Sequence, residues 1–135
     1  MPLPFEFIID GPPVSQQARR TKRVLQWKQE VRRAAQQVWP AGELPVTEPV
    51  MIAITYFYGG ASMDVDNIPK PVLDALKGLV YMDDEQLTDI TCRKRDLNAS
   101  LRVTNSSSVL AEGLGRNNEF LYVVVKRSLD QEVID

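Results

Sequence analysis

Four charged side chains in one stretch of the sequence have types and spacing that suit catalysis. Asp64 and Asp66 lie two residues apart, Lys70 follows four residues later, and Asp84 comes after a further apolar segment. In an extended segment, residues two apart point to the same side, so Asp64 and Asp66 can present both carboxylates to one point. Two like charges so close together are unfavourable unless a cation lies between them. We therefore predict that Asp64, Asp66 and Asp84 form a three-carboxylate metal site.

The nature of these ligands predicts the metal and the reaction. Carboxylate oxygens without nitrogen or sulfur ligands favour Mg²⁺, for which Mn²⁺ can substitute. Such a site retains water, which can attack a phosphodiester while the metal stabilises the developing charge. Lys70 lies one helical turn after Asn67, from where its ammonium group can reach the scissile phosphate or position the attacking water. Asp74, four residues further on, is expected to pair with Lys70.

The composition excludes other hydrolytic mechanisms. The 135 residues include no histidine and one cysteine, Cys92. A Ser-His-Asp or Cys-His relay is therefore impossible, as is a zinc site built from imidazoles or several thiolates. A lone cysteine allows no intrachain disulfide, so we expect a reducing, cytoplasmic location. We expect no membrane segment, because no apolar run approaches about 20 residues, and no signal peptide is visible.

The same acidic residues have a structural alternative. The Asp-x-Asp-Asn pattern before a helix is typical of capping, with Asn67 placed as the cap and Asp66 near the positive end of the helix dipole. Asp83 and Gln86 resemble a capping box of their own. Each motif alone fits capping as well as metal binding.

The pattern of apolar residues predicts the elements that position these side chains. Strands are expected over residues 3–9, 49–58, 87–96 and 119–127, and helices over 21–39 and 68–79. Residues 49–58 are apolar on both faces, as in a central strand, whereas the polar segment 87–96 is typical of an edge strand. The order β-α-β-α-β-β predicts an α+β fold in which a mixed β-sheet packs with two main helices, in one small domain over residues 1–135.

Some segments and single residues are expected to have no chemical role. Residues 98–118 are rich in Asn, Ser and Gly and form either a flexible insertion or one short helix, and residues 128–135 are expected to be a frayed tail. Trp27 lies on the apolar stripe of the first helix, so we expect it in the core rather than stacked on bases. Tyr81 and Cys92 are also expected to pack inside the fold.

Charge is distributed unevenly along the chain. The net charge is −2, but residues 1–40 carry +4 and residues 64–89 carry −5. The first candidates for phosphate contacts are Arg19, Arg20, Lys22 and Arg23, and the second are Arg93, Lys94 and Arg95, which alternate on a strand and cannot all face one duplex. Basic segments on both sides of an acidic one suit an anionic polymer held beside a metal site. The alternative is that the basic runs are solvated surface, and the acidic balance argues against strong nonspecific binding of nucleic acid.

The composite pattern resembles a known family. The run Asp64-x-Asp66-Asn67-x-x-Lys70-x-x-x-Asp74-Ala75-Leu76, followed by Tyr81-x-Asp83-Asp84, is similar to the RusA family of Holliday junction resolvases. The early Gly11-Pro12-Pro13-x-Ser15 followed by basic residues is also similar, so that the resemblance covers about residues 5–97 and the closing strand. It implies a homodimeric endonuclease that uses Mg²⁺ to nick opposing strands of four-way DNA junctions in recombination and repair. It also implies that Asp64, Asp66 and Asp84 bind metal and that Lys70 is catalytic.

Three hypotheses follow from these patterns. The first is a RusA-like junction endonuclease dependent on Mg²⁺. The second is a non-catalytic DNA-binding module of the same fold, whose acidic residues cap helices. The third is a metal-dependent nuclease selective for other branched DNA, such as flaps or nicked duplexes.

Overall fold

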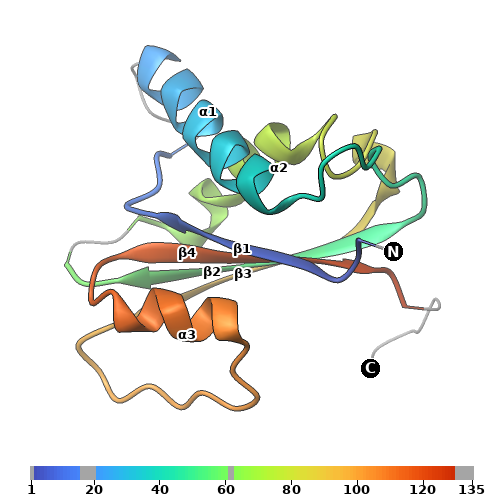
Figure 1. Ribbon diagram of the computed structural model, residues 1–135. Helices are drawn as coiled ribbons and strands as arrows, with labels where there is room; N and C mark the ends of the chain where they lie inside the picture. The colour runs from blue at the N-terminus through green and yellow to red at the C-terminus, as the bar shows by residue number, and fades with distance from the viewer. Residues whose placement is uncertain (1, 16–20, 61–62, 130–135) are drawn as a thin grey trace, which may run out of the picture.

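The computed structural model describes residues 2–15, 21–60 and 63–129 (Figure 1). The predicted tail therefore lies outside the described residues from residue 130 onward. The elements in chain order are β1 (Phe5–Asp10), α1 (Thr21–Val38), β2 (Val50–Tyr58), the short 3₁₀ helix η1 (Val65–Asn67), α2 (Pro69–Leu76), a second 3₁₀ helix η2 (Asp84–Gln86), β3 (Leu87–Asp96), α3 (Ser108–Gly115) and β4 (Phe120–Arg127). In this part of the chain no helix combines the length and apolarity needed to span a membrane.

The four strands form one mixed sheet in the order β1-β4-β2-β3. β2 and β3 pair in parallel, whereas β4 is antiparallel to both β1 and β2. The sheet confirms the predicted α+β class, with β2 in the interior and the polar strand β3 at an edge.

The helices cover both faces of the sheet. α1 and α2 lie over one face, and α3 lies over the opposite face (Figure 1). Phe5, Phe7 and Ile9 are buried because alternate residues of β1 point towards α1 and α2. Trp27 is 1% exposed and belongs to this core, as predicted. The sheet therefore separates two surfaces, each of which carries its own set of charged residues.

The segment of residues 98–118 contains the third helix. Ser107 caps α3 by accepting a hydrogen bond from the amide of Leu110 at 3.1 Å. α3 then packs against β1 and β4. The short helix that the sequence indicated here extends the predicted order to β-α-β-α-β-α-β.

The second helix differs from the prediction at both ends. It was predicted over residues 68–79 with Asn67 as its cap, but α2 spans Pro69–Leu76 and its N-cap residue is Ile68, without a side-chain cap bond. Asn67 instead closes η1, where its amide donates to the carbonyl of Asp64 at 3.0 Å. At the other end, Lys77 is extended and Gly78 has a φ of +86°, so the chain turns before residue 79.

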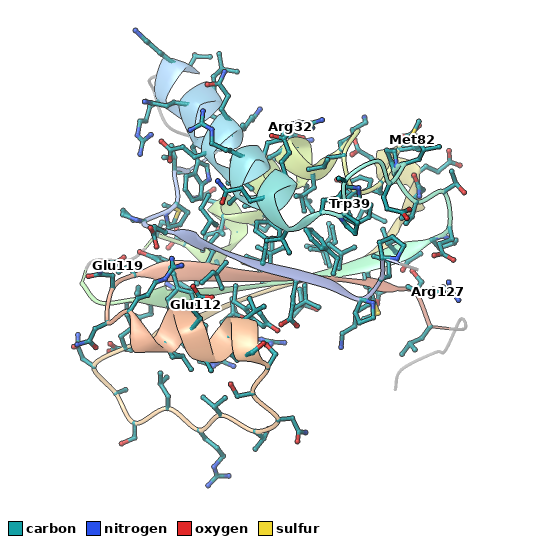
Figure 2. All side chains as sticks on the ribbon, in the orientation of Figure 1. Arg32, Trp39, Met82, Glu112, Glu119 and Arg127 are labelled. Atoms are coloured by element: carbon teal, nitrogen blue, oxygen red, sulfur yellow. The ribbon has the colours of Figure 1, made fainter. Side chains whose placement is uncertain are left out.

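Long-range hydrogen bonds fasten the C-terminal end of α2. Arg32 of α1 donates through Nη1 to the carbonyl oxygens of Ala75 at 3.1 Å and Lys77 at 3.0 Å, and Figure 2 shows Arg32 beside α2. The hydroxyl of Tyr81 donates to the carbonyl of Leu73 at 2.7 Å. Tyr81 is fully buried, which confirms its predicted packing role. These bonds add to the backbone hydrogen bonds at the end of α2, and they fix α2 in place between the acidic segments at its two ends.

The close contact of α3 with the sheet predicts a position that tolerates only glycine. A Cβ atom at Gly113 would lie 2.4 Å from the ring of Phe120, which stacks on Phe57. We expect Gly113→Ala to lower the free energy of unfolding by about 2 kcal/mol, because the buried ring has no space to move. Gly115→Ala in the same helix meets no atom within 4 Å, and we expect it to be neutral or slightly stabilising. Equal effects in urea denaturation of the two variants would contradict this assignment.

Candidate active site

Asp64 and Asp66, two residues apart in the chain, precede the N-terminus of α2. Asp64 has an extended backbone and directly precedes η1, and Asp66 lies within η1. Both side chains are exposed. Asp64 makes no capping bond, and neither carboxylate forms a hydrogen bond or ion pair with another described residue. Capping through Asp64 or Asn67 is therefore wrong as an account of the Asp-x-Asp-Asn motif.

Asp83, in contrast, has the capping role that its spacing indicated. Its Oδ1 accepts from the amide of Glu85 at 3.4 Å, and the Oε1 of Gln86 accepts from the amide of Asp83 at 2.9 Å. Gln86 also donates to the carbonyls of Val46 and Glu48, each at 2.9 Å. This capping box, confirmed by the structure, leaves Asp84 as the member of the Asp83-Asp84 pair that is available for a ligand.

Lys70 is held by an acidic residue, as predicted. Its Nζ lies 2.9 Å from Oδ1 of Asp74. The other oxygen of Asp74 lies 3.1 Å from Nζ of Lys28 on α1, a contact that the sequence analysis missed. Asp74 therefore joins α1 to α2 and fixes the position of Lys70, whose side chain stays 54% exposed.

The ion pairs set the protonation states of this cluster. Burial raises the pKa of Asp74, but hydrogen bonds and charge from Lys70 and Lys28 outweigh it and hold the pKa below its usual value. The hydrogen bond to Asp74 raises the pKa of Lys70, as does the charge of Asp74 and, more weakly, that of Asp84. Lys70 is consequently an ammonium ion at neutral pH and lies within electrostatic reach of both acids.

Asp84 is paired with a different lysine. Its Oδ2 lies 3.5 Å from Nζ of Lys77, and both side chains are about half exposed, at 53% and 44%. Asp64 and Asp66 precede α2 whereas Asp84 follows it, and a helix of eight residues is about 12 Å long. Over residues 2–15, 21–60 and 63–129, no three acidic or cysteine side chains are grouped so that they could hold one metal ion. The predicted convergence of the three aspartates is not formed here and stays a prediction for a metal-bound state.

The predicted phosphate-binding residues fall into two groups. Arg19 and Arg20 lie outside the described residues. Lys22 and Arg23 are exposed in the first turns of α1, and Arg23 is 3.4 Å from Glu30. Contacts of these residues with nucleic acid stay a prediction.

The basic triplet of β3 is divided between the two faces of the sheet, as its alternation predicted. Arg93 and Arg95 line a cleft on the face that α3 covers. The Nζ of Lys94 lies 5.8 Å from the ring centre of Tyr58. Cys92, in the same strand, is only half-buried, and burial raises the pKa of its thiol to about 11.

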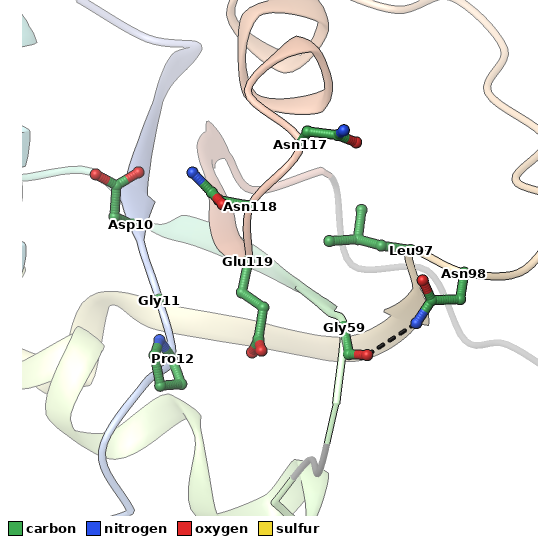
Figure 3. A pocket seen from close by; sticks show the side chains of 9 residues that line it. All are labelled: Asp10, Gly11, Pro12, Gly59, Leu97, Asn98, Asn117, Asn118 and Glu119. Atoms are coloured by element: carbon green, nitrogen blue, oxygen red, sulfur yellow. Dashed lines mark hydrogen bonds between the residues drawn. The ribbon is translucent and has the colours of Figure 1, made fainter.

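A second hollow lies at the end of β2, where Gly59 lines it. It has a volume of about 620 Å³, and Figure 3 shows Glu119 pointing into the space between Gly11-Pro12 and Gly59. Glu119 accepts a hydrogen bond from the hydroxyl of Tyr56, and burial raises the pKa of that tyrosine. This pair was not predictable from local spacing, because the two residues are 63 positions apart.

The ion pairs of Asp74 predict a pH dependence of stability. A carboxyl group with a lowered pKa in the folded state stabilises the protein above its unfolded-state pKa of about 3.8, and this contribution is lost as the pH falls through the folded-state value. We expect Asp74→Asn to lower the free energy of unfolding at pH 7, and we expect the difference from wild type to shrink as the pH falls below about 4. Urea denaturation at a series of pH values measures it, and a difference that is the same at pH 3 and pH 7 would refute the ion-pair account.

Comparison with known proteins adds one finding to this geometry. The family model described as Endodeoxyribonuclease RusA matches residues 12–104, more than half of the chain. The matched region includes η1, α2 and β3 and therefore Asp64, Asp66, Lys70, Asp84 and the basic residues predicted to contact phosphate. No curated protein matches the chain.

Proposed function

The chain belongs to the RusA family of endodeoxyribonucleases, and from this premise we propose that it resolves four-way (Holliday) DNA junctions by Mg²⁺-dependent hydrolysis of phosphodiester bonds, in DNA recombination and repair. The observation that carries the proposal is the pair of exposed carboxylates, Asp64 and Asp66, which have no structural partner among the described residues. Lys70, which Asp74 keeps charged and holds in place, follows Asp66 by four residues in the sequence.

The donor groups fit the proposed metal in chemical type. Asp64, Asp66 and Asp84 offer carboxylate oxygens, which Mg²⁺ prefers, and the chain has no histidine to compete. A bound Mg²⁺ ion would act as a Lewis acid and supply a water of lowered pKa. The donors are also accessible, since all three side chains are exposed.

Asp84 is the ligand that must change its partner. Its ion pair with Lys77 is 3.5 Å long and exposed, and such pairs contribute no more than about 1 kcal/mol. The free energy needed to break the ion pair between Asp84 and Lys77 is therefore small compared with the electrostatic attraction of Asp84 to a divalent cation. Lys77 holds this carboxylate in the protein without metal.

Lys70 acts on the substrate in this proposal. Its ammonium group stabilises the negative charge that builds up on the phosphate as the bond to the leaving oxygen breaks. Asp74 and Lys28 position it through ion pairs of 2.9 Å and 3.1 Å. In this proposal the ammonium group of Lys70 interacts with the substrate, while the ion pair with Asp74 restrains its side chain.

The proposed substrate requires two such sites. Symmetric nicks in opposing strands of a junction call for two active sites related by a two-fold axis, so we propose a homodimer. Phosphate contacts are assigned to Arg19, Arg20, Lys22 and Arg23 near α1 and to Arg93 and Arg95 on β3, through charge neutralisation.

Substitution of one acidic residue tests the proposal. We expect Asp66→Asn to abolish cleavage of a labelled four-way junction, because the substitution removes a negatively charged metal ligand. Binding of the junction should stay measurable, because the basic residues are unchanged. Asp89→Asn, which neutralises an exposed aspartate on β3 outside the site, is the matched control and should cleave at the wild-type rate. Full cleavage by the Asp66→Asn variant would disprove the assignment.

The same variants separate the proposal from its two alternatives. Saturating Mg²⁺ should raise the melting temperature of wild type by about 3 °C and leave Asp66→Asn unchanged. A non-catalytic DNA-binding module predicts no such difference and no cleavage. Faster cleavage of flaps or nicked duplexes than of four-way junctions would identify a nuclease for other branched DNA.

The ion pair of Asp84 predicts that one lysine competes with the metal. We expect Lys77→Gln to lower the Mg²⁺ concentration needed for half-maximal thermal stabilisation by up to about fivefold, because the free Asp84 carboxylate no longer exchanges one partner for another. Combination with Asp84→Asn should abolish this gain. An unchanged or higher Mg²⁺ requirement in Lys77→Gln would show that Asp84 is not a ligand.

A further inference from the structure

A basic cleft lies on the face of the sheet opposite α2. Arg93 and Arg95 project from β3 on this face, and Arg102 projects from the segment that connects β3 to α3. The cleft has a volume of about 390 Å³, and its floor includes Thr55, Phe57 and Tyr122. The strand register places Arg93 beside Thr55 of β2 and Thr55 beside Tyr122 of β4, so that the cleft crosses three strands.

The positive charge of this cleft is not compensated. All three arginines are exposed, and none forms an ion pair with a described residue. No aspartate or glutamate lines the cleft. The nearby Tyr122 hydroxyl donates to Glu6 at 3.0 Å, but Glu6 belongs to β1, at the other edge of the sheet from β3.

The spacing of the arginines suits a chain of anions better than a single one. Residues two apart on a strand are about 6.6 Å apart, so Arg93 and Arg95 present their guanidinium groups in a row. Arg102 adds a third group from the other wall of the cleft. Guanidinium groups bind phosphate oxygens in pairs of parallel hydrogen bonds, and water screens their mutual repulsion only in part.

We propose that this cleft binds consecutive phosphate groups of a DNA strand, with Arg102 as a DNA-contacting residue in addition to Arg93 and Arg95. The inference rests on the proposed function, because it assigns the cleft to the same substrate. The edge strand β3 connects the two sites, since η1 with Asp66 contacts β3 on one side and the arginines project from β3 on the other. A strand of the junction held at η1 thus continues around this edge of the sheet into the cleft.

The salt dependence of binding tests the cleft without catalysis. Binding of a labelled four-way junction is measured in EDTA at about 50 to 200 mM salt. The logarithm of the binding constant falls linearly with the logarithm of the salt concentration, and each lost phosphate contact makes this slope less steep by about 0.9. We expect the double variant Arg93→Gln/Arg102→Gln to have a slope that is less steep by about 1.8. The control is Arg33→Gln/Lys126→Gln, which removes the same charge from exposed positions outside the cleft and should leave the slope within about 0.5 of wild type.

The outcomes separate this inference from the proposed function. An unchanged slope in the cleft variant overturns the inference, and junction cleavage by wild type in Mg²⁺ then leaves the proposed function standing. A lowered slope in a protein that binds but never cleaves the junction supports the cleft and refutes the nuclease proposal. Thermal stabilisation by inorganic phosphate that needs Arg93 and Arg102, without any change in the DNA slope, would assign the cleft to a small phosphate and also overturn the inference.

Discussion

Parallel pairing of β2 and β3 is the constraint on which the arrangement of the site depends. Parallel neighbours require a connection that returns along the sheet before the second strand begins, and the segment between β2 and β3, which contains η1, α2 and η2, makes this return. The acidic residues before and after α2 are therefore held at its two ends, and the charged side chains of the helix lie between them. Bonds from Arg32 and Tyr81 to carbonyls of the last turn of α2 and the residue that follows it, together with the Lys28–Asp74 ion pair, fix the helix against α1 and the sheet.

The elements with a strong apolar period were predictable from the sequence to within one or two residues. The strands β1, β2 and β4 and the helix α1 belong to this group, because each buries one or both faces, and β3 was recognised by the polar character of an edge strand. The ends of α2 were not predictable in the same way. The 3₁₀ turn η1 took up Asn67, and the left-handed conformation of Gly78 stopped the helix before residue 79. The placement of α3 depends on contact with the sheet, where only Gly113 leaves space for the Phe120 ring.

The contacts in the candidate site also differ in how far the sequence predicts them. Pairs close in sequence were predictable, as Lys70 with Asp74 and Asp83 with Gln86 illustrate. Pairs that depend on tertiary structure were not, namely Lys28 with Asp74, Lys77 with Asp84, and Tyr56 with Glu119. Asp74 and Asp84 form ion pairs and Asp83 caps η2, whereas Asp64 and Asp66 have no such role within the described residues. This contrast, more than the motif alone, distinguishes a ligand-binding acid pair from a structural one.

The central claim is that Asp64 and Asp66 come together with Asp84 around a divalent cation beside Lys70. Paramagnetic Mn²⁺ in place of Mg²⁺ tests it directly, since the ion broadens the NMR signals of backbone amides near its binding site. The account predicts that the amides of residues 64–67 and 83–85 broaden together at the same Mn²⁺ concentration, and that neither group does so in Asp66→Asn. Broadening confined to one of the two segments, or spread evenly over the acidic surface, would contradict it.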